Sequence, residues 1–170
     1  MRPQDLKKFF LTVYDEHADA IYRFCLVRTS DTEVAHDVTQ DTFMRFWDTL
    51  VKKGEVEYPR ALIYQIARNA IIDWYRKHKA ESLDELQDQG LELEDGVVGK
   101  VEIQVEHAHV LSVLKDISEA HREIITLRFV EGLPPREIAE ILGETTNSVS
   151  VRINRAIKEL QAKLQTESYE

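Results

Sequence analysis

The chain has 170 residues, of which 43% are hydrophobic, and its 31 acidic and 22 basic side chains give a formal net charge of −9. This length accommodates one medium domain or two small ones with real cores. There is no apolar run near the length of a membrane span and no signal-peptide pattern, so we expect a cytoplasmic protein without membrane insertion. A single cysteine, Cys25, excludes an internal disulfide and, among apolar neighbours, is predicted to be a core residue.

Helical periodicity dominates residues 6–78, and the strong breaks occur near Ser30, Gly54 and Pro59. Three or four packed helices are therefore expected in this part of the chain. Ser30 with Glu33 three positions later resembles a capping box, which predicts that a helix begins there.

The helix after Ser30 has two distinct faces at 3.6 residues per turn. One face is predicted to point inward and gathers Ala35, Thr39, Thr42, Phe43, Phe46 and Leu50. The opposite face gathers Asp37, Gln40, Asp41, Met44, Trp47 and Asp48. An acidic face that also displays a methionine and a tryptophan suits docking on a basic protein partner. The alternative is that Trp47 turns into the domain core.

The next helix begins at Pro59 and combines aromatic with basic side chains. Its inward face is predicted to contain Ile63, Ile66, Ala67, Ala70 and Trp74, and its outer face Tyr64, Arg68, Ile72, Tyr75 and Arg76. Residues 60–79 contain five Lys or Arg and one acid, Asp73, which favours contact with phosphates and unstacked bases. The alternative is ordinary helix packing by the two tyrosines, with basic residues serving the helix dipole.

The negative charge is concentrated in the middle of the chain. Residues 1–80 contain 13 basic and 12 acidic side chains, residues 81–112 contain one and nine, and residues 113–170 contain eight and ten. With glycines and little periodicity, this middle is predicted to be a flexible acidic linker, residues 81–109, between near-neutral domains at 1–80 and 110–170.

Within that linker, Glu106, His107 and His109 form a poor metal site, because the two histidines have no cysteine partner. The chain also has no Gly-rich phosphate loop, nucleophile elbow or zinc-protease motif. We expect no metal, no cofactor and no catalytic residues, hence no enzyme.

Residues 127–160 predict a helix-turn-helix. Pro134 and Pro135 can only begin a helix, and Gly143 is predicted to end it. The inward face of this helix is predicted to contain Ile138, Ala139, Ile141 and Leu142. Thr145 or Thr146 then caps a second helix, with Val149, Ile153, Ala156 and Leu160 facing inward. Polar and basic side chains are left outward near its N-terminal end, as in a helix that enters a DNA groove. The alternative is a helical hairpin with a solvated polar face.

Taken in order, DVTQDTFMRFWDTL, PRALIYQIARNAIIDWYRKHK, the acidic linker and LKDISEAHREIITLRFVEGLPPREIAEILG resemble the extracytoplasmic-function (ECF) type of bacterial RNA polymerase sigma factor, in the sigma-70 family. The resemblance covers roughly residues 6–79 and 110–164. It implies an all-α protein of two small helical domains. The first is a region 2 bundle that docks on core polymerase and opens the minus-10 promoter element, and the second is a region 4 helix-turn-helix that reads the minus-35 element.

The resemblance also implies site residues, position by position. Core polymerase binding is assigned to the outward face of the first acidic helix, at Asp37, Gln40, Asp41, Met44 and Trp47. Minus-10 DNA binding is assigned to residues 51–58 and to Tyr64, Arg68, Asn69, Asp73 and Arg76. Minus-35 DNA binding is assigned to Thr146, Asn147, Ser148, Ser150, Arg152 and Arg155. The expected partners are core RNA polymerase, promoter DNA and an anti-sigma factor, and the linker is expected to thread toward the nascent RNA path.

Three residues depart from the family pattern in the second domain. Glu144 replaces an apolar residue of the turn, Asn147 a small residue, and Ser150 a residue that is often basic. The attraction of this helix for DNA phosphates is therefore expected to be weak, which suits a subunit that reads promoters only when tethered to polymerase. The competing hypothesis is a stand-alone regulator that binds DNA as a dimer through residues 119–162 and needs two-fold half-sites.

Overall fold

The computed structural model describes residues 2–88 and 112–167, and within these stretches every regular element is helical. The chain divides into two compact units, residues 1–99 and residues 100–170. The predicted all-α class with two helical domains is thus confirmed. Most of the predicted linker, residues 89–109, lies outside the described residues, as do Glu106, His107 and His109.

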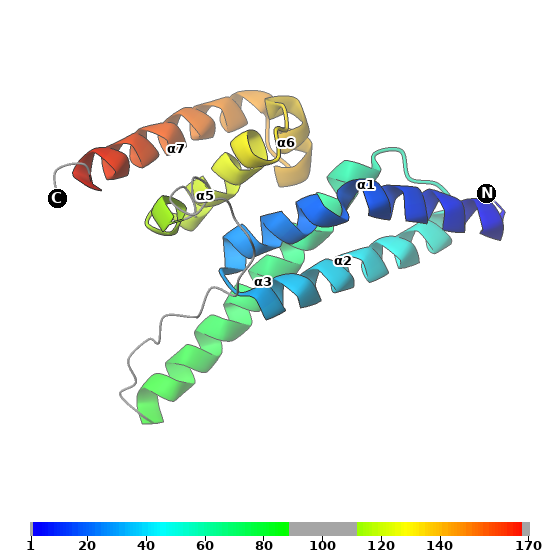
Figure 1. The fold of residues 1–170 in the computed structure, drawn as a ribbon, viewed down its shortest axis with the longest axis horizontal. Helices are drawn as coiled ribbons and strands as arrows, with labels where there is room; N and C mark the ends of the chain where they lie inside the picture. Colours follow the sequence, from blue (N-terminus) through cyan, green and yellow to red (C-terminus); the bar gives the residue numbers. More distant parts are fainter. Residues whose placement is uncertain (1, 89–111, 168–170) are drawn as a thin grey trace. The chain divides into compact units, whose positions relative to one another are not determined.

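The first unit contains three described helices, α1 (Pro3–Thr29), α2 (Thr32–Lys53) and α3 (Pro59–Asp88). Figure 1 shows α1 and α2 running side by side, and both of them contact α3. Helix α3 continues through Asp88, so the first residues of the predicted linker are helical. The predicted breaks near residues 30, 54 and 59 all coincide with helix ends.

The junction between α1 and α2 differs from the predicted capping box. Ser30 ends α1 in the left-handed conformation, with φ of 53°, and its N–H donates to the Leu26 carbonyl at 2.8 Å. Asp31 caps α2 instead, because its carboxylate accepts from the Val34 N–H at 3.0 Å. An aspartate is as good a cap as serine, and its negative charge is also stabilised by the positive end of the helix dipole.

Aromatic and aliphatic side chains form the core of the first unit. Phe24 and Phe46 are fully buried, and Phe46 stacks on Phe10 with ring centroids 6.1 Å apart. Cys25 is also fully buried, as predicted, and burial raises the pKa of its thiol to about 12. Tyr75 adds a tie between helices, since its hydroxyl donates to the backbone carbonyl of Arg28.

The second unit contains α5 (Glu119–Ile125), the π-helical turn η1 (Thr126–Val130), α6 (Pro135–Leu142) and α7 (Thr146–Glu167). Helix α6 begins at Pro135, as predicted, and ends at Gly143, whose φ of 67° is the left-handed conformation that glycine adopts without steric cost. Thr145 caps α7 by accepting from the Ser148 N–H at 3.1 Å. The helix-turn-helix is therefore confirmed.

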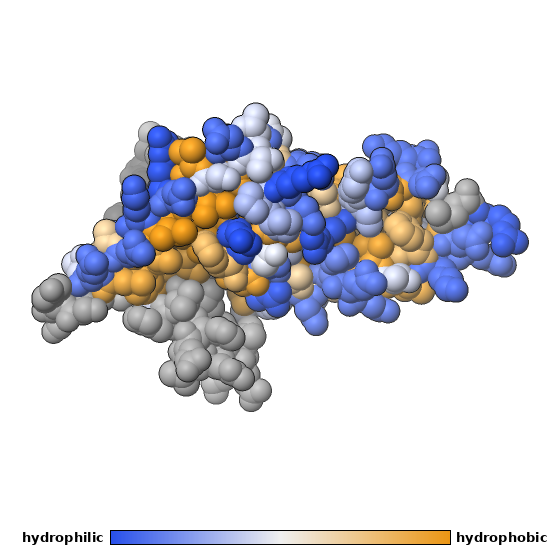
Figure 2. Space-filling view, turned by 90° about the horizontal axis from the view of Figure 1, so that it is seen from above, coloured by the Kyte–Doolittle hydropathy of each residue, from blue (hydrophilic) through white to orange (hydrophobic). Residues whose placement is uncertain are grey.

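The inward faces of this motif follow the predicted spacing. Ile138, Ala139 and Ile141 of α6 are buried, and so are Val149, Ile153 and Ala156 of α7. Leu142 and Leu160 are only partly buried, because each lies at the edge of its apolar face. Hydrophilic side chains cover much of the visible surface in Figure 2, with apolar strips between them.

Candidate protein-binding and nucleic-acid-binding surfaces

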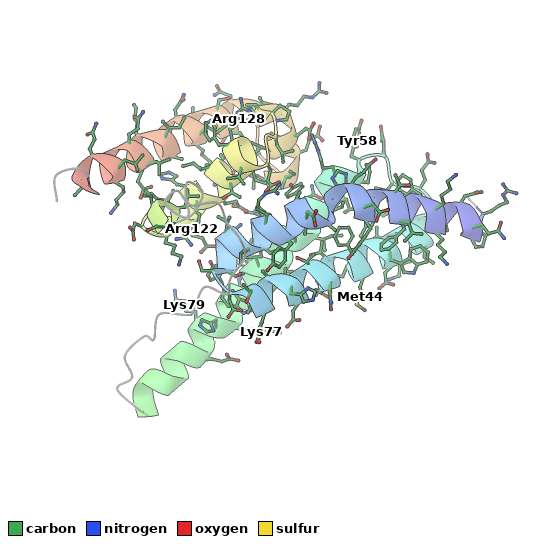
Figure 3. The ribbon with its side chains drawn as sticks, in the orientation of Figure 1. Met44, Tyr58, Lys77, Lys79, Arg122 and Arg128 are labelled. Carbon is green, nitrogen blue, oxygen red and sulfur yellow. The ribbon has the colours of Figure 1, made fainter. Side chains whose placement is uncertain are left out.

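The two faces of α2 are divided as the helical register predicts. All six predicted inward residues, Ala35, Thr39, Thr42, Phe43, Phe46 and Leu50, are buried. On the opposite face Asp37, Gln40 and Asp48 are exposed, and Met44 is 68% exposed. Figure 3 shows the Met44 side chain projecting from α2 toward solvent. An exposed methionine among carboxylates has no role in the core, so it is available to a partner.

Trp47 and Asp41 of the same face have partners within the domain. Trp47 is half-buried, because its ring meets the Phe10 ring edge-on at 5.2 Å. It therefore supports the core on one side and remains accessible on the other. The Asp41 carboxylate accepts from Nε of Arg45 at 2.8 Å, a surface pair within one helix. We call the outward set Asp37, Gln40, Asp41, Met44, Trp47 and Asp48, in which Asp41 and Trp47 are half-buried, the α2 face.

An open groove of about 540 Å³ lies between α1 and α2. Tyr14 and Tyr22 of α1 and His36 of α2 line it, and Asp19 and Glu33 add negative charge. Sequence reasoning missed this groove, because its residues come from two helices whose relative rotation no single-helix pattern defines. Like the α2 face, the groove combines acidic with aromatic side chains.

The placement of Tyr64 on the outer face of α3 was wrong. Tyr64 is 2% exposed, and its ring packs edge-on against Phe24 with centroids 5.4 Å apart. Because α3 contacts both α1 and α2, its buried arc is wider than one stripe, and Ile71 is buried as well. A buried tyrosine cannot stack on a DNA base while this packing holds.

The other predicted minus-10 residues form an accessible row along α3. Asn69, Asp73 and Arg76 are exposed, whereas Arg68 is partly buried. Further along the same helix, Lys77 and Lys79 are exposed and extend the positive surface (Figure 3). Electrostatically, this stretch is the part of the first unit best suited to phosphates.

An exposed aromatic ring lies in the loop that precedes α3. Tyr58 is 61% exposed, and Val51 at the end of α2 is 51% exposed. Figure 3 shows the Tyr58 ring projecting from this loop. An exposed tyrosine beside a basic helix is a stacking platform of the kind that Tyr64 was expected to supply.

On α7 the predicted minus-35 residues divide into exposed and restrained side chains. Thr146, Asn147 and Arg155 are exposed. Ser150 is partly buried, and its hydroxyl donates to the Thr146 carbonyl at 3.0 Å. Ser148 and Arg152 are also partly buried, and both contact Glu144 in the turn. Sequence reasoning assigned them outward without anticipating this contact.

The far end of the C-terminal unit is tied together by Glu159 of α7. Its carboxylate accepts from the Ser118 N–H at 3.1 Å and contacts Nδ1 of His121 on α5. The hydrogen bond from His121, followed by the Ser118 backbone bond, holds the pKa of Glu159 below its ordinary value. This cluster positions α7 against α5 and is separate from the polar N-terminal end of α7.

The described residues contain neither a candidate metal site nor a candidate membrane span. In residues 2–88 and 112–167, His, Cys, Asp and Glu side chains do not gather in threes as a metal site requires. None of the helices in the same part of the chain combines the length and apolarity needed to cross a membrane.

The fold and these surfaces are those of a helix-turn-helix protein that carries a second helical unit with an acidic face. Residues 13–81 match the sigma-70 region 2 family, and residues 110–160 match sigma-70 region 4. The chain therefore belongs to the ECF sigma factors of the sigma-70 family, the alternative sigma factors that initiate transcription.

Named relatives agree with this family. The ECF RNA polymerase sigma factor SigL of Mycobacterium tuberculosis is 30% identical over 154 residues, which cover 90% of this chain and 87% of SigL. SigM of Bacillus subtilis is 29% identical over 159 residues, which cover 88% of this chain and 91% of SigM. The structure of RpoE from Bartonella quintana, solved with the anti-sigma factor NepR, has a TM-score of 0.69 at 25% identity and covers 95% of this chain and 98% of RpoE.

Proposed function

We propose that this sigma factor docks on core RNA polymerase through the α2 face and contacts the minus-10 and minus-35 elements through α3 and α7. The observation that carries the docking proposal is the exposure of Met44 at 68% between exposed acidic residues. Apolar surface surrounded by carboxylates fits a partner that offers basic and apolar groups together. The order of the two family regions along the chain supports the assignment of the two promoter elements.

For the minus-10 element, we propose that Asn69, Asp73 and Arg76 contact the DNA, together with Arg68 and the loop at residues 51–58. The exposure of Asn69, Asp73 and Arg76 supports this assignment. Promoter opening then depends on holding the unstacked strand better than the duplex, because only differential binding shifts the equilibrium. We propose Tyr58 in place of Tyr64 as the stacking ring, since Tyr58 is exposed and Tyr64 is not.

For the minus-35 element, we propose that the N-terminal end of α7 enters the major groove. Thr146, Asn147 and Arg155 offer hydrogen-bonding groups on the exposed side of this helix. Ser148, Ser150 and Arg152 belong to the same surface, but in this structure their side chains already bond to groups of the protein itself. They must exchange these bonds for bonds to DNA.

The remaining features of the proposal come from the family. We propose that the domains are region 2 at residues 1–80 and region 4 at 110–170, that the residues between act as a linker, and that the protein works in the cytoplasm, where polymerase is. It contributes binding and has no catalytic activity of its own. RpoE was solved with NepR, and CnrH was solved with the cytosolic domain of CnrY. We propose that an anti-sigma factor likewise holds this chain.

The proposed function is tested with the purified full chain and bacterial core RNA polymerase. We expect the two to comigrate and to start discrete transcripts from a library of promoter-containing fragments. Specific binding of the chain alone to a two-fold symmetric duplex, without comigration, would instead support the dimeric regulator.

The minus-10 assignment is tested by Asn69→Ala and Tyr58→Ala, with Asp15→Ala on α1 as a control for an exposed helical substitution. We expect both test variants to lose transcripts from duplex promoters and to recover them on templates whose minus-10 region is already mismatched. Recovery distinguishes a defect in opening from a defect in polymerase docking. Full activity of both variants on duplex promoters contradicts the assignment.

A further inference from the structure

A single carboxylate organises the N-terminal end of α7. Glu144 lies in the turn between α6 and α7, and its Oε2 accepts from the Ser148 hydroxyl at 2.9 Å. Its Oε1 accepts from Nη1 of Arg152, two turns along α7. The side chains of Glu144 and Arg152 are 29% and 22% exposed, so the pair is partly shielded from water. An ion pair that is both shielded and hydrogen-bonded is stronger than one on the open surface.

Arg152 is held from a second direction within the same unit. Its Nη2 donates to the Ala120 carbonyl of α5 at 3.4 Å. The guanidinium group is therefore tied to the turn on one side and to α5 on the other. This geometry keeps the charge of Arg152 within the domain rather than extended toward a ligand.

The charge of this end of α7 follows from the sequence. Arg152 is the one cationic residue of residues 144–153, and Glu144 is the one acidic residue. The pair therefore leaves the end of the helix electrically neutral. The next cations, Arg155 and Lys158, are exposed and lie further along α7.

The Glu144 carboxylate and a DNA phosphate compete for the same guanidinium N–H donors of Arg152. Each phosphate that a protein neutralises releases counterions and makes the salt dependence of binding steeper by about 0.9 in the logarithmic slope. An arginine held by its own carboxylate contributes no such contact until the pair is broken. The neutral side chains Thr146 and Asn147 are then the first groups to meet the DNA.

We propose that Glu144 is a specificity-determining residue, which holds Arg152 away from DNA phosphates and so lowers the sequence-independent affinity of the helix-turn-helix for duplex DNA. This inference rests on the proposed reading of duplex DNA by α7. Discrimination then depends on neutral side chains at base edges and on the tether to polymerase. Glu144 acts through Arg152 and is a positioning residue, with no contact to the base pairs required of it.

The experiment measures binding of the full chain to a duplex of unrelated sequence by fluorescence anisotropy over a salt series. Glu144→Gln removes the charge and keeps the shape, and Glu144→Ala also removes the acceptor, in case the amide still holds Arg152. We expect tighter binding by several-fold and a slope steeper by about 0.9. The gain over the wild type should therefore shrink about threefold when salt rises from about 50 to about 200 mM.

Two further variants separate release of Arg152 from a general change in charge. Asp116→Asn removes one exposed carboxylate from the same unit. It is expected to change affinity less than Glu144→Gln and to leave the slope unchanged. Adding Arg152→Ala to Glu144→Gln is expected to abolish the gain. Elution from heparin, a polyanion at high local concentration, ranks the same variants if duplex binding is weak.

The proposal is overturned if neither Glu144 variant exceeds Asp116→Asn, or if the gain persists without Arg152. These outcomes are independent of polymerase. A wild-type chain that fails to direct polymerase would remove the proposed function, whereas the salt slopes would still report whether Glu144 restrains Arg152. Thermal unfolding of each variant shows whether the fold is retained.

Discussion

Reversing the charge of the α2 face is the most direct perturbation of polymerase docking. Asp37→Lys with Asp41→Lys changes the charge of the face by four units, whereas both side chains lie outside the core. The structural cost is small, because Asp41 pairs with Arg45 on the surface of the same helix, and such a pair is worth about 0.3–0.5 kcal/mol. We therefore expect the free energy of unfolding to change by less than about 1 kcal/mol.

The effect on binding is expected to be far larger. Close charge pairs across protein interfaces have coupling energies of about 1.5 kcal/mol or more, and like charges in contact add repulsion. Two reversed charges therefore cost about 3 kcal/mol at least, which corresponds to a loss of affinity of about a hundredfold. The assay is titration of labelled core polymerase with the variant, accompanied by thermal unfolding of the variant alone.

The matched control reverses two charges elsewhere in the same unit. Asp15 and Glu16 are exposed on α1, and Asp15→Lys with Glu16→Lys produces the same change in net charge. We expect this control to retain affinity within a few-fold. Equal losses in the two double variants, or none in the α2 variant, would refute the reasoning that the α2 face docks on polymerase.

Three further predictions concern stability and reactivity. Phe46→Ala removes a fully buried ring and is expected to destabilise the first unit by about 3–5 kcal/mol in chemical denaturation. The lowered pKa of Glu159 means that its carboxylate stabilises the C-terminal unit above about pH 4.5 and that this stabilisation is lost as the pH falls through the folded-state pKa. Glu159→Gln should therefore lower the Tm near neutral pH, with the difference from wild type vanishing in acid. The Cys25 thiol, with its pKa raised to about 12 by burial, should resist alkylation at about pH 8 until the protein is unfolded.

Much of the fold follows from local rules that the sequence carries by itself. Helical period alone separated Phe46 and Leu50 from Asp37 and Met44, because α2 has one buried stripe. Pro135 and Gly143 defined the ends of α6, since proline lacks a backbone donor and glycine adopts positive φ freely. The order of the two family motifs along the chain is enough to indicate the class of protein.

The tertiary structure decided the properties that depend on how helices meet. Tyr64 became a core residue because α3 packs against two helices at once, which no single-helix register can state. Asp31, not Ser30, became the cap of α2 because α1 extends through Thr29 and uses Ser30 as its own end. Arg152 was outward by register, yet Glu144 and the Ala120 carbonyl of another helix hold it. The sequence thus determined which faces are apolar, whereas the side chains available to DNA were decided by contacts between segments distant along the chain.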